Sequence, residues 1–342
     1  MGTLDGLLED LAAQRDFVAE RAPVYARILE LLPDVLPWER LEEAWAGRSF
    51  GAWYERPLLI LAGLRNDALA EGAAHPLWRA MGNDAGLHAV TRDALGAALS
   101  AERGLWHELR HRHLQTNETS RAVAWLWPAH LLANAVSGGS LEVFDIGASA
   151  GLNLVADALP GIWTGSDGTP LEIEPLPRVV KRRGYDLRPL DPDDEDAARW
   201  LRACVWPGQG ERERRLERAL AAWRTFEPRP ELVTARAGDV PDLLPRGGGP
   251  MLAFQTVMRD YLPDTERERY EVGMARWLAD CPPGRAMWVE LEVTETAREG
   301  GPPAAITAHL RDATYALATC DPHPTVLAVD DAAVREFSHR LG

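Results

Sequence analysis

The chain has 342 residues, 46% of them hydrophobic and 26% charged, so it is long enough for two domains and has a globular composition. Its formal net charge is −15 without any basic run, which argues against nucleic acid as the main partner, because phosphate backbones are bound by clustered cations. No apolar run approaches transmembrane length and the acidic start lacks the features of a signal peptide, so we expect a cytoplasmic protein without a membrane partner. Three widely spaced cysteines predict a reducing compartment and no disulfide framework: Cys204, Cys281 and Cys320.

The first part of the chain is predicted to be helical. Apolar residues recur at helical spacing over residues 4–32, with a break at Pro23, then over 58–69 and within 90–114. Its many tryptophans fit packing between helices, with an aromatic substrate cage as the alternative.

No alternating strand pattern precedes residue 140. We therefore expect a helical N-terminal domain or cap over residues 1–135 and an α/β domain over residues 136–342.

An H-E-x-x-H motif lies within the helical part. On a helix, His107 and His111 would share one face and could bind zinc, with Glu108 as the base. The metzincin extension would need glycine and histidine where this chain has Leu114 and Asn117. We therefore favour a solvated helix face and expect no metal site.

A polar cluster, QTNETSR, precedes an apolar helix over residues 122–136. Capping of that helix explains the cluster structurally. The functional alternative is that the turn lies over a ligand site, where Gln115, Asn117 and Arg121 would contact the substrate and Glu118 would be a candidate base.

The central motif is LEVFDIGASAGLNL, residues 141–154. A short apolar run predicts a buried parallel strand with Asp145 near its carboxyl end. Gly147 and Gly151 then open a turn into a helical pattern. Such a turn at the carboxyl edge of a parallel sheet is where α/β folds bind nucleotide-like ligands.

The spacing differs from the G-x-G-x-x-G of dinucleotide folds. It resembles the D/E-x-G-x-G-x-G turn of class I S-adenosylmethionine-dependent methyltransferases, with Ser149 at the middle glycine. In that family the acid faces the cationic methionyl part of the cofactor. The alternative is a glycine turn that only packs strand against helix. The resemblance implies cofactor contacts from Asp145, Gly147, Ala148, Ser149, Gly151 and Asn153.

Two further acids follow predicted strands. Asp186 ends a strand over residues 179–187, where a carboxylate can accept from both ribose hydroxyls, with Glu172 or Glu174 as alternatives. Asp239 follows the strand 232–235, and its Gly-Asp pair resembles the methyltransferase position that contacts adenine. A surface turn explains that pair equally.

The later strands supply the remaining candidates. A strand over residues 251–257 brings Thr256 toward the cofactor, and the following MRDYL segment lies over the expected active site. Tyr261 in that segment and Glu290 in the strand 286–293 are candidate bases.

Strand and helix thus alternate from residue 141 to 293, with a possible short strand at 171–173, and end in a hairpin of residues 314–319 and 325–329. This order predicts an α/β, doubly wound, Rossmann-like sheet of seven strands with an antiparallel last pair, the layout of class I methyltransferases.

Four segments together resemble the domain-of-unknown-function family numbered 2332: QTNETSR, EVFDIGASAGLNL, RRGYDLRPLD and LRACVWPGQGERERRLERAL. The resemblance covers roughly residues 10–330. It implies a helical N-terminal part followed by a methyltransferase-like domain, and it leaves the activity open.

The leading hypothesis is an S-adenosylmethionine-dependent methyltransferase, monomeric or homodimeric, that acts on a small-molecule acceptor. The second hypothesis is a non-catalytic protein of this fold that binds S-adenosylmethionine or a nucleoside. The third is a zinc hydrolase that uses His107 and His111.

Overall fold

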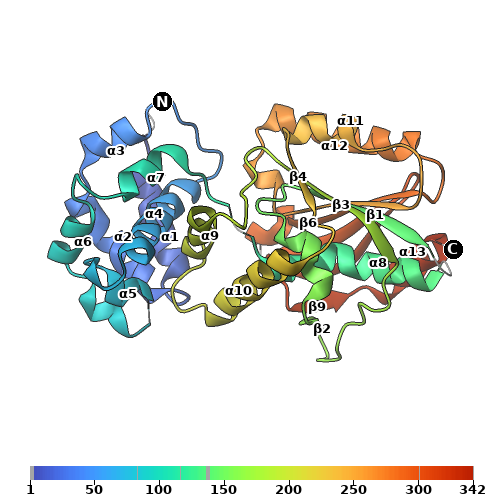
Figure 1. The fold of residues 1–342 in the computed structure, drawn as a ribbon, viewed down its shortest axis with the longest axis horizontal. Helices are drawn as coiled ribbons and strands as arrows, with labels where there is room; N and C mark the ends of the chain where they lie inside the picture. The colour runs from blue at the N-terminus through green and yellow to red at the C-terminus, as the bar shows by residue number, and fades with distance from the viewer. Residues whose placement is uncertain (1–3, 83, 116, 136–138, 300, 342) are drawn as a thin grey trace. The chain divides into compact units, whose positions relative to one another are not determined.

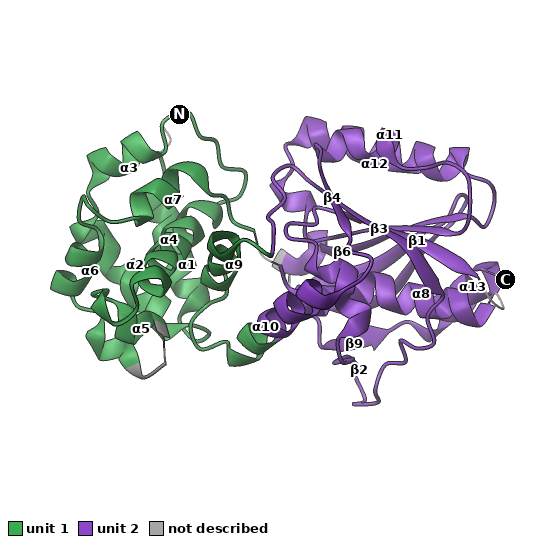
Figure 2. Cartoon of the chain, in the orientation of Figure 1, with its two compact units in different colours: residues 1–116, 193–214 green, residues 117–192, 215–342 purple. Residues whose placement is uncertain are grey.

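The chain forms two compact units (Figure 2). Unit 1 comprises residues 1–116 and 193–214, and unit 2 comprises residues 117–192 and 215–342. We expected a single boundary at residue 135; the first division lies at 116, and the chain later returns to unit 1. The computed structural model describes residues 4–82, 84–115, 117–135, 139–299 and 301–341.

Unit 1 is helical, as the apolar spacing predicted. Pro23 begins a helix at the expected break, because proline fits the first turn, where no backbone N–H bond is needed. The helices are α1 (Leu7–Val18), α2 (Pro23–Val35), α3 (Trp38–Ala44), α4 (Glu55–Glu71), α5 (Trp78–Gly82), α6 (Arg92–Ala98), α7 (Leu105–His111) and α9 (Glu195–Ala203), with the 3-10 helices η1 (Gly72–Ala74) and η2 (Asp84–Ala89).

Helix α9 explains why residues 193–214 belong to unit 1. It packs against α4. Its Trp200 is fully buried, and the indole Nε1 donates to the carbonyl of His113 at 3.0 Å. The next helix, α10 (Gly210–Thr225), begins in unit 1 and ends in unit 2.

Unit 2 contains one sheet in the order β2-β9-β8-β7-β6-β5-β1-β3-β4. The run from β4 to β6 is parallel, whereas β7, β8 and β9 join antiparallel and β2 pairs parallel with β9. The strands are β1 (Ser140–Ile146), β2 (Thr164–Gly165), β3 (Arg178–Asp186), β4 (Glu231–Thr234), β5 (Met251–Thr256), β6 (Ala286–Val293), β7 (Ala304–His309), β8 (Thr314–Cys320) and β9 (Val326–Val329).

The described sheet therefore has nine strands where we expected seven. The five parallel strands and the closing β8–β9 pair follow the prediction. Strand β7 was missed because half of its sequence, AAITAH, is alanine, which has low β propensity. The strand expected at residues 171–173 is absent from that described segment, and the two-residue β2 lies just before it.

Helices cover both faces of the sheet (Figure 1). Along β5, Leu252 and Phe254 pack in the core that includes Trp125, whereas Met251 and Ala253 pack in the core that includes Trp277. This alternation places one apolar layer on each face and confirms a mixed α/β architecture. The covering helices are α8 (Val123–Ala135) and α13 (Asp331–Leu341) on one side, and α11 (Val240–Leu243) and α12 (Asp264–Asp280) on the other.

Four short 3-10 helices follow strands of unit 2, and a fifth, η3 (Thr119–Ala122), precedes α8. The four are η4 (Leu152–Ala158), η5 (Ala237–Asp239), η6 (Arg259–Tyr261) and η7 (Glu295–Glu299). Across the part of the chain that is described, we find no helix with both the length and the apolar character needed to cross a membrane.

Candidate functional site

The segment after β1, residues 147–151, forms a tight turn that we call the β1 turn. Gly147, Ser149 and Gly151 all have left-handed backbone conformations, with φ of 78°, 53° and 71°. The N–H groups of Gly147 and Ala148 both donate to the carbonyl of Tyr185, at 2.8 and 3.0 Å, which ties the turn to the end of β3. The helical segment expected after the turn is the 3-10 helix η4.

The carboxylate of Asp186 also holds this turn. Its Oδ2 accepts from the backbone N–H of Ser149 at 2.8 Å, and its Oδ1 accepts from that of Arg188 at 2.8 Å. We expected Asp186 to bind a ribose. A carboxylate has about four acceptor positions, so these two bonds leave acceptor capacity for hydroxyl groups.

Asp145, at the end of β1, is buried at 1% exposure. Neither of its carboxylate oxygens has a hydrogen-bond partner among the residues that the structure describes. Burial, and secondarily the charge of Asp186, raise the pKa of Asp145 well above its usual range. An unpaired carboxyl group in such a place is costly, and perturbed groups of this kind are concentrated at functional sites.

Three more buried oxygens beside the β1 turn lack a partner within the described ranges. They are Asn117 Oδ1, Ser149 Oγ and Asn153 Oδ1. The Asn117 amide donates to the carbonyl of Ala148 at 3.1 Å, and the carbonyl of Asn153 accepts from the Trp125 indole at 2.8 Å. These bonds fix Asn117 and Asn153 beside the turn, while their side-chain oxygens and Ser149 Oγ have no partner among the described residues.

The glycines themselves are explained by backbone conformation and packing. A Cβ on Gly151 would lie 2.7 Å from Leu232 Cδ2, and one on Gly147 would lie 3.0 Å from Met258 Cγ. Both positions also have positive φ, which favours glycine. The case for a ligand therefore rests on the unpartnered oxygens rather than on the glycines.

Two of the candidate bases are ion-paired carboxylates. Glu118 is buried, pairs with Arg215 at 3.0 Å and accepts from the N–H of Ser120, so it caps the short helix η3 rather than the helix over residues 122–136 that the cluster was expected to cap. Glu290 lies between Arg259 Nη2, at 2.5 Å, and His309 Nε2, at 2.7 Å. The third candidate base, Tyr261 in η6, is 37% exposed.

The remaining predicted residues lie apart from this cluster or have structural partners. Asp239 pairs with Arg269 at 2.5 Å, and both side chains are substantially exposed. Arg121 donates from Nε to the carbonyl of Pro322 at 2.8 Å. Thr256 ends β5 opposite Leu291. Gln115 belongs to unit 1, whereas the β1 turn belongs to unit 2.

A second polar group, which the sequence analysis missed, lies between β5 and β6. Glu292 accepts from Gln255 Nε2 at 2.9 Å, and Gln255 Oε1 accepts from the Trp288 indole at 3.1 Å and from the Tyr270 hydroxyl. The signal was present: Gln255 interrupts an apolar strand, and Glu290 and Glu292 alternate within WVELEV, which puts them on one face.

The H-E-x-x-H motif lies on α7 in unit 1. The rings of His107 and His111 are 4.6 Å apart, and Glu108 pairs with Arg112 at 3.0 Å. Among the described residues, no group of three or more His, Cys, Asp or Glu side chains is arranged to hold a metal.

The chain was compared with known proteins. A family model described as "Uncharacterized protein conserved in bacteria (DUF2332)" matches residues 9–328. No curated protein matches the chain.

Proposed function

This chain belongs to the DUF2332 family, and we propose that it binds S-adenosylmethionine at the β1 turn and transfers the methyl group to a small-molecule acceptor. The observation that carries the proposal is the buried, unpaired carboxyl group of Asp145 beside a tight turn at the carboxyl edge of a parallel sheet. A cationic ligand would neutralise that charge at low dielectric, where electrostatic attraction is strong.

The residues at the turn fit such a ligand. The methionyl part carries a sulfonium and an ammonium besides its own carboxylate, and Asp145 would neutralise its net positive charge. The oxygens of Asn117, Ser149 and Asn153 would accept from the ammonium N–H groups. The unused acceptor positions of Asp186 would take ribose hydroxyls. Asp239 would contact the adenine amino group after release from Arg269, a contact supported only by its place after β4.

When bound, S-adenosylmethionine supplies an electrophilic methyl group. The chain's own part is mainly to orient the cofactor and an acceptor in line, because holding two reactants in the right geometry provides much of the rate. Glu118 and Glu290 each form an ion pair with an arginine, so we assign them a positioning role rather than the role of a base. Tyr261 remains the candidate for moving a proton from the acceptor.

A second candidate is a protein of the same fold that binds the cofactor without transferring its methyl group. The observation that favours it is that both candidate carboxylate bases are ion-paired. Tight binding without methyl transfer across a broad panel of small-molecule acceptors would support this function.

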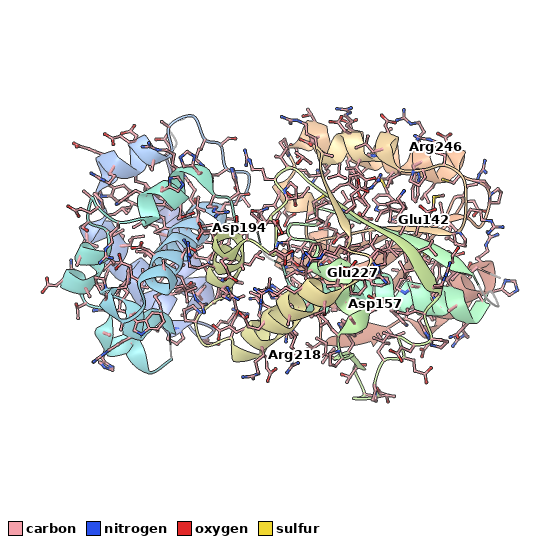
Figure 3. The ribbon with its side chains drawn as sticks, viewed as in Figure 1. Glu142, Asp157, Asp194, Arg218, Glu227 and Arg246 are labelled. Carbon is pink, nitrogen blue, oxygen red and sulfur yellow. The ribbon has the colours of Figure 1, made fainter. Side chains whose placement is uncertain are left out.

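The proposal is tested by calorimetric titration with S-adenosylhomocysteine. We expect micromolar binding by the wild type and at least about tenfold weaker binding by Asp186→Ala, which loses both the anchor of the turn and the ribose acceptor. Glu142→Ala is the matched control, because Glu142 lies near the other end of β1 (Figure 3). Absence of binding to the wild type would contradict the proposal.

A further inference from the structure

The chain leaves β5 through a left-handed residue that is not glycine. Val257 has φ of 48°, and its N–H still donates to the carbonyl of Leu291 at 2.8 Å, so the sheet bond is kept while the chain turns. A β-branched residue with positive φ is a genuine outlier, and such conformations persist only where the surroundings enforce them.

The carboxylate of Glu292 provides that enforcement. Its Oε1 accepts from the backbone N–H of Met258 at 3.0 Å, and both of its oxygens lie 3.3 Å from the N–H of Arg259. Gln255 orients the same carboxylate from β5. Glu292 is 6% exposed, so these bonds form away from solvent and are charge-assisted when it is ionised.

Met258 connects this turn to the candidate ligand site. Its side chain is buried and packs on the β1 turn, where a Cβ added to Gly147 would lie only 3.0 Å from Met258 Cγ. The two non-glycine residues with positive φ, Ser149 and Val257, therefore lie in turns that are packed together, within the part of the chain that is described.

We propose that Glu292 is a positioning residue for the site at the β1 turn: it holds the left-handed turn at Val257 and thereby keeps Met258 packed on Gly147. The identity of the ligand rests on the proposed function, whereas the clamp on residues 257–259 does not.

Protonation should weaken the clamp. Burial raises the pKa of Glu292 to about 7. The charged or titratable groups around it are Glu290 on the same strand, Arg259 in η6 with its partner Glu271 in α12, Tyr270 in α12 and His309 in β7. Because the ionised form accepts the backbone bonds more strongly, ligand affinity should fall as the pH drops through about 7.

The test combines amide hydrogen exchange of the ligand-free full chain with titration by S-adenosylhomocysteine. Glu292→Ala should speed exchange at Met258 and Arg259 and weaken the ligand about tenfold. Glu292→Gln keeps one acceptor oxygen but, like the protonated wild type, carries no charge, so we expect exchange rates and affinity between those of the wild type and Glu292→Ala, and a flatter pH profile between about pH 6 and 8. Glu142→Ala should change none of these.

The outcomes separate the two claims. Unchanged exchange at residues 258 and 259 in Glu292→Ala overturns the clamp. Faster exchange with unchanged affinity overturns its link to the ligand site. If the wild type binds no ligand, the proposed function fails and the link falls with it, while exchange still decides the clamp. If Glu292→Ala does not fold, an affinity profile in Glu292→Gln identical to that of the wild type overturns the proposal.

Discussion

At the scale of single residues, Asp145 should reduce the stability of the ligand-free protein. Its pKa in the folded state is raised by burial above the unfolded value of about 3.9. The folded state therefore binds more protons than the unfolded state, and its stability falls as the pH rises above about 4 toward the folded pKa. The carboxylate has no protein partner, within the described residues, to offset this cost.

We therefore expect Asp145→Asn to stabilise the ligand-free protein at neutral pH by roughly 1 to 3 kcal/mol, because the amide does not ionise and each unit of difference between the folded and unfolded pKa corresponds to about 1.4 kcal/mol. The gain should be larger at pH 8 than at pH 5, because the wild type loses stability as the pH rises above the unfolded pKa, whereas the amide does not titrate. Urea denaturation at both pH values measures it. A variant less stable than the wild type at both would show that Asp145 is satisfied in the folded protein.

At the scale of elements, the contact between β3 and the β1 turn requires a glycine at position 184. A Cβ there would lie 2.7 Å from the Cβ of Ala148 and 2.8 Å from Leu232 Cδ2. The first of these neighbours belongs to the turn itself, which is also fixed by the carbonyl of Tyr185. A side chain at 184 must therefore push the turn away from β3.

Gly184→Ala should cost roughly 1 to 3 kcal/mol, the usual effect of overpacking, and should also weaken ligand binding at the turn. Gly139→Ala is a suitable control, because an added Cβ there meets no atom within 4 Å. Thermal unfolding of both variants measures the difference. Equal midpoints would mean that the turn can shift without cost.

How well elements could be predicted depended on whether their signal was local. The apolar run of β1 and the glycines after it are contiguous in sequence, so strand and turn were predicted correctly. The bond between Gln255 and Glu292 joins two strands separated by α12, and neither residue alone indicates the other. Strand β7 was missed because its alanines carry neither an alternating pattern nor a β propensity.

At the scale of the whole molecule, the division into units departs from the order of the sequence. Helix α8 is the next α-helix after α7 of unit 1 in the sequence, yet its Trp125 packs with Phe254 of β5 and belongs to unit 2. Residues 193–214 follow three strands of the sheet and still belong to unit 1. Helical periodicity predicts that a segment is a helix, but the partner that buries its apolar face is set by the fold.

The candidate site was predicted in part for the same reason. The sequence placed Asp145, Ser149 and Asn153 together, because they lie within one short segment. It did not reveal that Asp186 would bind the backbone of the turn, or that Glu118 and Glu290 would be ion-paired. These partners lie far away in the sequence.

The most direct test of the central claim is to titrate wild type and Asp145→Asn with S-adenosylmethionine and with adenosine. Adenosine lacks the cationic methionyl part, so it reports the rest of the site. We predict that the substitution weakens S-adenosylmethionine at least about tenfold and leaves adenosine unchanged. Equal effects on both ligands, or no binding of S-adenosylmethionine to the wild type, would contradict the assignment of Asp145 to a cationic ligand.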